Sequence, residues 1–262
     1  MGGGVKIQIN GIFSTVFERP IDNFFFNIRR NRIYNQNSKK IKSLKNLHKN
    51  ERCFIIGTGP SLNNTDLDLI KNEIIFGVNT LYRGFKKFSF KCNYYAITDL
   101  EVWEKNYNNI LELNSKIFLS GGACENYLSN YKQFKDYKTD NLYLIKYLGN
   151  MWSLNQFSKD LSEGTYNGDT IIIDICLQAA YYLGFNQVYL LGCDCDYSGM
   201  HRFDGSITEN LRGGGVSGDW SKVFASYEIC KKIYEENVRK IINCTVGGKL
   251  EIFERKKLEE II

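Results

Sequence analysis

Short runs of apolar residues alternate with segments of helical periodicity from residue 51 to the end of the chain. A short apolar run that ends in Gly, Asn or Asp is typical of a buried strand. On this basis we predict strands at residues 53–56, 74–78, 92–98, 116–119, 142–147, 187–191 and 240–246. Because helical segments lie between many of these strands, we expect an α/β fold with a doubly wound, mostly parallel, Rossmann-like sheet.

The most regular unit lies in the second half of the chain. Gly168-Asp169-Thr170 begins an apolar helix that we expect to run to Leu183, where Gly184 ends it. The strand at 187–191 follows and leads into Gly192-Cys193-Asp194. A helix, a glycine stop and a strand in this order form half of a right-handed βαβ crossover.

The net charge of +5 is distributed unevenly along the 262 residues. Residues 1–50 hold ten Lys and Arg against Glu18 and Asp22, a net charge of +8, so residues 51–262 carry −3. We therefore predict a basic N-terminal arm at 1–50 and a Rossmann-like, nucleotide-binding catalytic domain at 51–262. A mildly acidic body disfavours nucleic acid as a partner.

The arm contains a stretch that suits an anionic membrane surface. Phe24-Phe25-Phe26 and Ile28 stand beside Arg29 and Arg30, so apolar side chains can enter the headgroup boundary while basic groups meet anionic lipid. We expect peripheral contact with the inner face of the membrane. A flexible tail, or docking of these aromatic residues on the body or on a second subunit, are the alternatives.

The eight cysteines do not form the pattern of a disulfide framework or a zinc site. No C-x-x-C occurs, and the chain has two histidines. We expect free thiols in a reducing cytoplasm. The apolar runs are far shorter than a membrane-spanning helix needs, and the residues at 1–5 lack the pattern of a secretory signal.

Glycines and polar residues follow several of the predicted strands. Because ligands bind at the carboxyl ends of strands in such sheets, we predict a nucleotide site there. Its residues are Gly57, Thr58, Gly59, Ser61, Asn79 and Asp99. The segment Gly57-x-Gly59-Pro60-Ser61 lets backbone amides approach a phosphate, although a tight turn without a ligand is the alternative. Asn79 and Asp99 could instead cap the segments that follow them.

Two further groups of residues are candidates for binding an anion or a metal. Gly168, Asp169 and Thr170 offer backbone amides at a helix N-terminus, either to a phosphate or only to a capping side chain. Asp194-Cys195-Asp196 places two carboxylates where they could hold Mg²⁺ on a diphosphate, although Asp196 could simply cap a turn. Asp194 is also a candidate catalytic residue.

Residues 195–219 are rich in glycine, and we predict a mobile lid that excludes water from the reaction. His201 in this loop is the predicted general base, and Asp219 is the second candidate. Three basic residues are expected to neutralise phosphate charge, namely Arg202, Arg212 and Lys249.

Five blocks of sequence form a recognisable set, at 52–62, 76–79, 180–185, 188–194 and 245–251. The first contains Gly57-Thr58-Gly59-Pro60-Ser61-Leu62. As a set, the blocks resemble the MptE-like superfamily over residues 51–254. That superfamily includes archaeal 6-hydroxymethylpterin diphosphokinases and flagellin-modifying Maf glycosyltransferases. The first block is also similar to the bacterial sialyltransferases of lipooligosaccharide synthesis.

The resemblance to the sialyltransferases implies a donor site and a position for the base. Gly57, Gly59, Ser61 and Asn79 would line the site of a nucleotide-activated donor, and Asp99 matches a second donor-binding Asn of those enzymes. Their catalytic His matches a position near Asp219. We therefore favour a glycosyltransferase of surface glycan synthesis, which transfers a sugar from a nucleotide-activated donor to a glycan or lipid-linked acceptor and requires no cofactor.

Two other functions remain open at this point. A 6-hydroxymethylpterin diphosphokinase would transfer diphosphate from ATP, with Mg²⁺ held by Asp194 and Asp196. A non-catalytic nucleotide-binding module would bind nucleotide and never turn it over.

Overall fold

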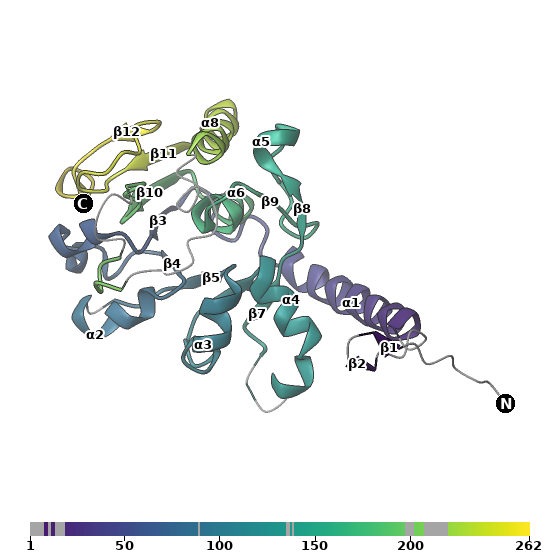
Figure 1. Cartoon of the computed structure of the whole chain (residues 1–262). Helices are drawn as coiled ribbons and strands as arrows, with labels where there is room; N and C mark the ends of the chain where they lie inside the picture. Colours follow the sequence, from purple (N-terminus) through teal and green to yellow (C-terminus); the bar gives the residue numbers. More distant parts are fainter. Residues whose placement is uncertain are drawn as a thin grey trace.

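The structure of the chain, a computed structural model, describes residues 8–9, 12–13, 19–88, 90–134, 137, 139–196, 202–206 and 220–262. Its centre is one parallel sheet with helices on both faces (Figure 1). The strand order is β12-β11-β10-β3-β4-β5-β6-β7. The strands are β3 (Arg52–Ile56), β4 (Ile75–Val78), β5 (Tyr94–Ile97), β6 (Lys116–Leu119), β7 (Leu142–Leu144), β10 (Gln187–Leu191), β11 (Lys240–Asn243) and β12 (Glu254–Arg255). The predicted doubly wound, Rossmann-like α/β fold is confirmed.

The sheet reverses its direction of growth between two adjacent strands. The chain adds β4, β5, β6 and β7 on one side of β3, and then returns to place β10, β11 and β12 on the other side. In register, Ile56 of β3 pairs with Leu191 of β10, so both strands end side by side. This is the topological switch point, where open α/β sheets bind their ligands.

Helices of very different lengths and two small ribbons surround the central sheet. The α-helices are α1 (Arg19–Lys42), α2 (Phe85–Phe88), α3 (Leu100–Leu111), α4 (Gly121–Ser129), α5 (Met151–Leu154), α6 (Gln178–Leu183) and α8 (Ser221–Glu236). The 3₁₀-helices are at Pro60–Asn64, Leu67–Ile70, Leu81–Gly84, Tyr131–Phe134 and Leu258–Glu260. The ribbons pair β1 (Gln8–Ile9) with β2 (Ile12–Phe13), antiparallel, and β8 (Tyr147–Asn150) with β9 (Thr165–Asn167), parallel.

Alternate residues of the central strands face two separate hydrophobic layers. In β3, Cys53 and Ile55 pack in the layer that contains α6 and α8. Phe54 and Ile56 pack in the layer that contains α3 and α4. A strand buried on both faces is an uninterrupted apolar run, which is why the sequence identified it.

The prediction of a single strand at 142–147 is wrong. The amide of Ile145 still donates to the carbonyl of Leu119 at 2.8 Å, but the chain then leaves the central sheet. Tyr147 pairs with Thr165 in the second ribbon instead. An apolar run does not reveal which partner a strand will choose.

The predicted apolar helix at 168–183 is not one regular helix. Ile172–Leu177 is a π-helix, and α6 continues from Gln178 to Leu183. Gly184 ends it in the left-handed conformation with φ of 98°, as predicted. A Cβ at Gly184 would lie 3.0 Å from the Cα of Asn46, so the glycine also allows residues 46–49 to pack closely.

The second half of segment 1–50 belongs to the packed body. Helix α1 lies beside the edge strand β7, as Figure 1 shows, where the Asn37 amide donates to the carbonyl of Leu144 at 2.5 Å. Lys40 donates to the carbonyl of Leu142 at 2.7 Å, and Ile41 and Leu44 are buried in the core. The helix therefore satisfies an otherwise open sheet edge, and residue 50 does not mark the limit of the hydrophobic core.

The eight cysteines are all free thiols, and seven of them are buried. Among the described residues, every helix is too short or too polar to cross a bilayer.

Candidate functional site

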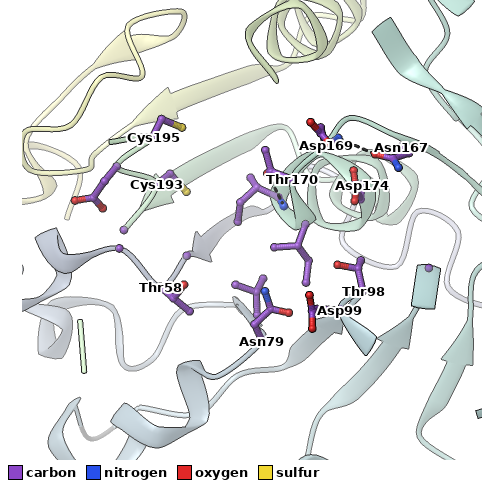
Figure 2. Close-up of a pocket in the computed structure, with 18 of the residues that line it drawn as sticks. Thr58, Asn79, Thr98, Asp99, Asn167, Asp169, Thr170, Asp174, Cys193 and Cys195 are labelled. Atoms are coloured by element: carbon purple, nitrogen blue, oxygen red, sulfur yellow. Dashed lines mark hydrogen bonds between the residues drawn. The ribbon is translucent and has the colours of Figure 1, made fainter. Parts of the chain in front are cut away.

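A cavity of about 410 Å³ opens at the carboxyl ends of the central strands, at the switch point (Figure 2). The structure brings many of the predicted site residues to its wall. These are Gly57, Thr58, Gly59, Asn79, Asp99, Asp169, Thr170, Asp194, Asp196 and Arg202. Ser61, Gly168 and Lys249 do not line it. His201, Arg212 and Asp219 lie outside the described residues.

The glycine loop after β3 packs tightly against the loop after β10. The amide of Gly57 donates to the carbonyl of Leu191 at 2.8 Å, and that of Gly59 to the carbonyl of Gly192 at 2.9 Å. A Cβ at Gly59 would lie 1.8 Å from Oδ2 of Asp194. The glycines are therefore needed for contact between the two loops. The expectation that their amides face a phosphate is wrong, because carbonyl groups already accept from them.

The carboxylate of Asp194 links the same two loops through hydrogen bonds. The hydroxyl of Ser61 donates to its Oδ2 at 2.7 Å, and the Ser61 amide donates to its Oδ1 at 3.1 Å. Ser61 is 5% exposed. Burial raises the pKa of Asp194, while the two bonds from Ser61 act in the opposite direction. Ser61 thus contacts Asp194, and the predicted donation of its hydroxyl to a ligand is not what the structure shows.

Asn79 follows β4 and carries an unsatisfied polar atom in the wall of the cavity. Its φ of 48° is left-handed, a conformation that Asn adopts more readily than most residues. Its side-chain Oδ1 is buried and accepts no hydrogen bond from the described residues. Unpaired buried acceptors are rare and costly, so this oxygen is a candidate to accept a hydrogen bond from a ligand.

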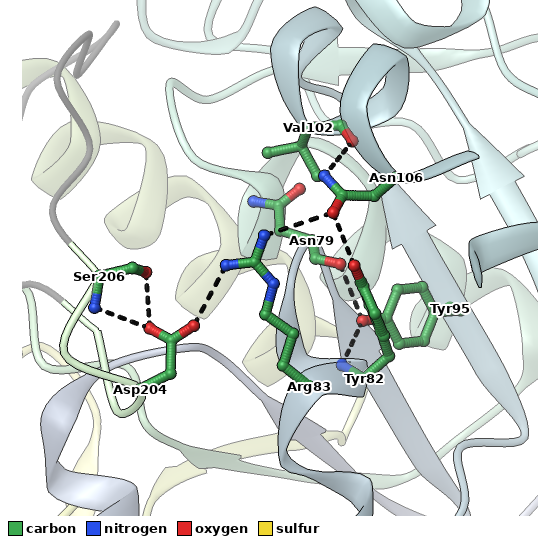
Figure 3. Close-up of polar contacts among 8 residues, drawn as sticks. All are labelled: Asn79, Tyr82, Arg83, Tyr95, Val102, Asn106, Asp204 and Ser206. Carbon is green, nitrogen blue, oxygen red and sulfur yellow. Dashed lines mark hydrogen bonds and ion pairs between the residues drawn. The ribbon is translucent and has the colours of Figure 1, made fainter. Parts of the chain in front are cut away.

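A polar network fixes the backbone of Asn79, as Figure 3 shows. The Tyr95 hydroxyl donates to the carbonyl of Asn79 at 2.8 Å and accepts from the amide of Tyr82 at 2.9 Å. The Tyr82 hydroxyl donates to Asn106 at 2.6 Å, and Arg83 donates to the same oxygen at 3.3 Å. Sequence reasoning missed this network, because its members come from three separate elements.

Of the predicted lid, residues 195, 196 and 202–206 are described, and the stretch 202–206 is anchored beside the cavity. Arg83 pairs with Asp204 at 3.3 Å (Figure 3), and the amide of Phe203 donates to the carbonyl of Thr58 at 3.0 Å. Phe203 is 7% exposed and packs on Phe88. These contacts hold Arg202 at the cavity wall, whereas the prediction treated the whole loop as mobile.

Asp99 caps a helix, which is one of its two predicted roles, and it also stands where the other role, binding of a nucleotide, was predicted. Its Oδ1 accepts from the amide of Val102 at 2.8 Å, which caps α3. The residue also lines the cavity, next to Asn79 in Figure 2.

The turn before the π-helix does not offer free amides to an anion. The amide of Gly168 donates to Oδ1 of Asp174 at 2.7 Å, and that of Asp169 donates to Asn167 at 2.7 Å (Figure 2). The hydroxyl of Thr170 accepts from the amide of Ile172 at 3.2 Å. The turn is closed by its own side chains, so the predicted second anion site is wrong.

Comparison with known proteins places the chain in a family. A family model described as 6-hydroxymethylpterin diphosphokinase MptE-like matches residues 25–200, which is more than half of the chain. The chain belongs to the MptE-like family. The predicted recognition is thereby confirmed at the level of the superfamily. No curated protein matches the chain.

Solved structures share the fold of this chain, and one of them is a glycosyltransferase. The Maf glycosyltransferase from Magnetospirillum magneticum AMB-1 matches with a TM-score of 0.50 and 15% sequence identity. The match covers 81% of this chain and 34% of that protein, so this chain spans about a third of its length. At this identity, the similarity shows a shared fold.

Both carboxylates of the D-x-D pair of this MptE-like chain have protein partners. Both oxygens of Asp194 accept hydrogen bonds from Ser61, and Asp196 pairs with Lys249 at 3.0 Å. Within the described ranges, no three His, Cys, Asp or Glu side chains group as metal ligands do. The carboxylates that the sequence assigned to Mg²⁺ are thus engaged by protein donors.

Asp174 is a cavity residue that sequence reasoning missed. It lies in the π-helix, is 5% exposed, and accepts from the hydroxyl of Tyr147 at 2.9 Å as well as from Gly168. Burial raises the pKa of Asp174 to about 7. The sequence does contain one indication of an unusual residue here, because Asp174 is the one charged residue in the apolar run at 171–177.

The described wall of the cavity is acidic. It holds five carboxylates and one guanidinium, from Asp99, Asp169, Asp174, Asp194, Asp196 and Arg202. Carboxylates and amide oxygens accept hydrogen bonds, so this wall suits a ligand with many hydroxyl donors.

Proposed function

We propose that this chain is a glycosyltransferase that takes a sugar from a nucleotide-activated donor, with the switch-point cavity as its donor site. One observation carries the proposal: a cavity of about 410 Å³ stands where nucleotides bind in doubly wound sheets, in a chain of the MptE-like family. The fold that the chain shares with a Maf glycosyltransferase supports the same class of reaction.

The chemistry of the wall favours a sugar over a purely phosphate ligand. The unpaired Oδ1 of Asn79 and the carboxylates can accept hydrogen bonds from hydroxyl groups. Transfer of a sialic acid is the narrower function that residues 52–62 suggest. Because the described wall is acidic, it disfavours the carboxylate of a sialic acid and the diphosphate of other sugar donors alike, so the donor panel must separate them.

The competing function is diphosphate transfer from ATP, which the description of the family model favours. That reaction needs charge compensation for a triphosphate, usually by Mg²⁺. Asp194 and Asp196 are already paired with Ser61 and Lys249, and this argues against it.

A thermal-shift experiment separates these functions. The panel is CMP, CDP, UDP, GDP and ATP, each with and without Mg²⁺, and stabilisation by mass action reaches about 2.7 kcal/mol at a hundredfold excess over Kd. We expect one nucleotide of a sugar donor to raise the melting temperature without metal. Asn79→Gly, which removes the unpaired acceptor, should reduce that shift. A response to ATP with Mg²⁺ alone would support the kinase, and no response to any nucleotide would refute the donor site.

We further propose that the acceptor is a glycan or lipid-linked glycan at an anionic membrane surface. Arg32, Lys39 and Lys42 are exposed on α1, away from its contacts with the sheet. Deleting residues 1–50 would remove buried Ile41 and Leu44, so charge reversal of the three exposed residues is the better test. Co-sedimentation with anionic vesicles should weaken in the reversed variant and at high salt. Equal sedimentation of both proteins would exclude this surface.

A further inference from the structure

A buried carboxylate with uncharged partners stands in the wall of the cavity. Asp174 is 5% exposed and lines the cavity together with Tyr147 (Figure 2 labels Asp174). Its Oδ2 accepts from the Tyr147 hydroxyl at 2.9 Å, and its Oδ1 accepts from the amide of Gly168 at 2.7 Å. A carboxylate has about four lone-pair positions, so these bonds leave it able to accept from a substrate hydroxyl.

Asp174 differs in this respect from the other carboxylates whose partners are described. Asp194 is bound through both oxygens to Ser61, and Asp196 pairs with Lys249. Asp99 accepts from the first turn of α3. Asp174 also closes a turn through Gly168, but its other oxygen is held by the hydroxyl of Tyr147, a residue that itself lines the cavity. It also lies in a π-helix, a distortion often found at functional sites.

The groups that face Asp174 are neutral or acidic. They are Tyr147 from β8, Asp169 from the preceding turn, Cys176 from the same helix and Cys230 from α8. Burial raises the pKa of Asp174 most, and Asp169 adds to the rise. Donation from Gly168, Tyr147 and Thr170 acts in the opposite direction. No cation among these groups holds the carboxylate ionised, so it can exchange a proton near neutral pH.

We propose that Asp174 is the catalytic base that receives the proton of the acceptor hydroxyl, with Tyr147 as its positioning residue. The inference rests on the proposed glycosyl transfer. As the acceptor oxygen bonds to the anomeric carbon of the donor sugar, the bond from that carbon to the phosphate oxygen breaks and the nucleotide leaves with the electron pair. The acceptor O–H proton passes to Asp174, which later releases it to water. Hydrolysis of the donor uses the same base, with water as the acceptor.

The test measures nucleotide release from UDP-glucose, UDP-N-acetylglucosamine, GDP-mannose and CMP-N-acetylneuraminic acid between pH 5 and 9. In the parent chain we expect turnover of the best donor to rise as pH increases through about 7, because the base must be ionised. Asp174→Asn should lower turnover by about 10²–10⁴-fold, with an unchanged thermal shift from the nucleotide. Tyr147→Phe removes a bond that favours the ionised form, so its profile should move to higher pH.

Cys176→Ala is the matched control, since it alters the same buried helix and removes a neutral thiol that makes none of the hydrogen bonds to the carboxylate named above. Its pH profile should coincide with that of the parent. If the parent turns over a donor and Asp174→Asn keeps both the rate and the pH profile, the role of Asp174 is refuted while the transferase stands. If the parent binds a nucleotide but releases none from any donor, the proposed transfer and the role of Asp174 fail together. If no nucleotide binds, the donor site itself is refuted.

Discussion

Two aspartates in one cavity, Asp194 and Asp174, show how position in the fold decides the task of a residue. Asp194 stands in a D-x-D pattern at a strand end, and its carboxylate joins two loops through Ser61. Asp174 has no motif, and its carboxylate lies in an apolar helix with Tyr147 and Gly168 as partners. The D-x-D motif predicted a metal ligand or a catalytic residue, whereas in the structure the Asp194 carboxylate links two loops. The isolated charge in an apolar run was the better indicator of an unusual site.

The largest expected effect is a pH dependence of stability that arises from Asp174. The unfolded chain ionises this group near its ordinary value of 3.8, whereas the folded chain keeps the proton up to a pKa of about 7. Between these values the folded state binds more protons, so the free energy of unfolding should fall as pH rises and then level off. A shift of this size corresponds to roughly 4 kcal/mol.

Urea unfolding between pH 4 and 8 measures this slope. Asp174→Asn resembles the protonated form, since its amide can donate to the Tyr147 hydroxyl and its oxygen can accept from Gly168. That variant should lose most of the slope. Asp169→Asn removes a carboxylate that adds to the rise in the Asp174 pKa, so it should reduce the slope slightly and retain most of it, because burial is the larger cause. An equal slope in Asp174→Asn and the parent would show that Asp174 is ionised in the folded chain.

The next effect concerns the close contact between the loop after β3 and the loop after β10, which contains Asp194. A Cβ at Gly59 would lie 1.8 Å from Oδ2 of Asp194 and 2.7 Å from the carbonyl of Gly192. Gly59→Ala should therefore destabilise the chain by about 1–3 kcal/mol or more. Gly205→Ala is the control, because its Cβ meets nothing within 4 Å and only its φ of 73° is strained. If Gly59→Ala unfolds at the same urea concentration as the parent, the contact between the two loops does not need a glycine at this position.

A smaller effect should follow from removing the donor to Asp194. Ser61→Ala deletes the 2.7 Å hydrogen bond to Oδ2, which should cost about 1–2 kcal/mol of stability. Because that bond lowers the pKa of Asp194, its loss should raise this pKa further. Ser43→Ala, which removes an exposed hydroxyl bonded to the carbonyl of Lys40, should change stability far less. If both variants have the same free energy of unfolding, the hydrogen bond from Ser61 to Asp194 does not stabilise the contact between the two loops.

The sequence was sufficient for the edge at which the cavity lies and for the central sheet except at its two ends, since it missed β12 and extended the strand at β7 too far. The strands are apolar at 53–56 and at 188–191, and glycines mark where both end. Their adjacency follows from the topology of doubly wound sheets, so the switch point could be predicted before its contacts were known.

The contacts inside the cavity could not be predicted in the same way. Ser61 and Asp194 are 133 residues apart, and Tyr147 and Asp174 are 27 apart. No local pattern states that such residues meet, since each pair depends on how the chain returns to the sheet. The basic character of residues 1–50 similarly concealed Ile41 and Leu44, whose burial shows that a charged helix can close a sheet edge.

The smallest predicted effect tests the cavity wall at Asn79, directly after β4. Loss of one hydrogen bond to its unpaired Oδ1 should weaken nucleotide-sugar binding by about 0.5–1.5 kcal/mol, which titration calorimetry with the best donor of the panel can measure. Asn79→Gly is the suitable variant, because glycine adopts the φ of 48° without strain and the fold should persist. Asn79→Ala should lose the same affinity and also some stability, since alanine is strained in that conformation. Full affinity in both variants would show that the ligand does not reach this wall, and the donor site would then lie nearer to Asp174 than to the end of β4.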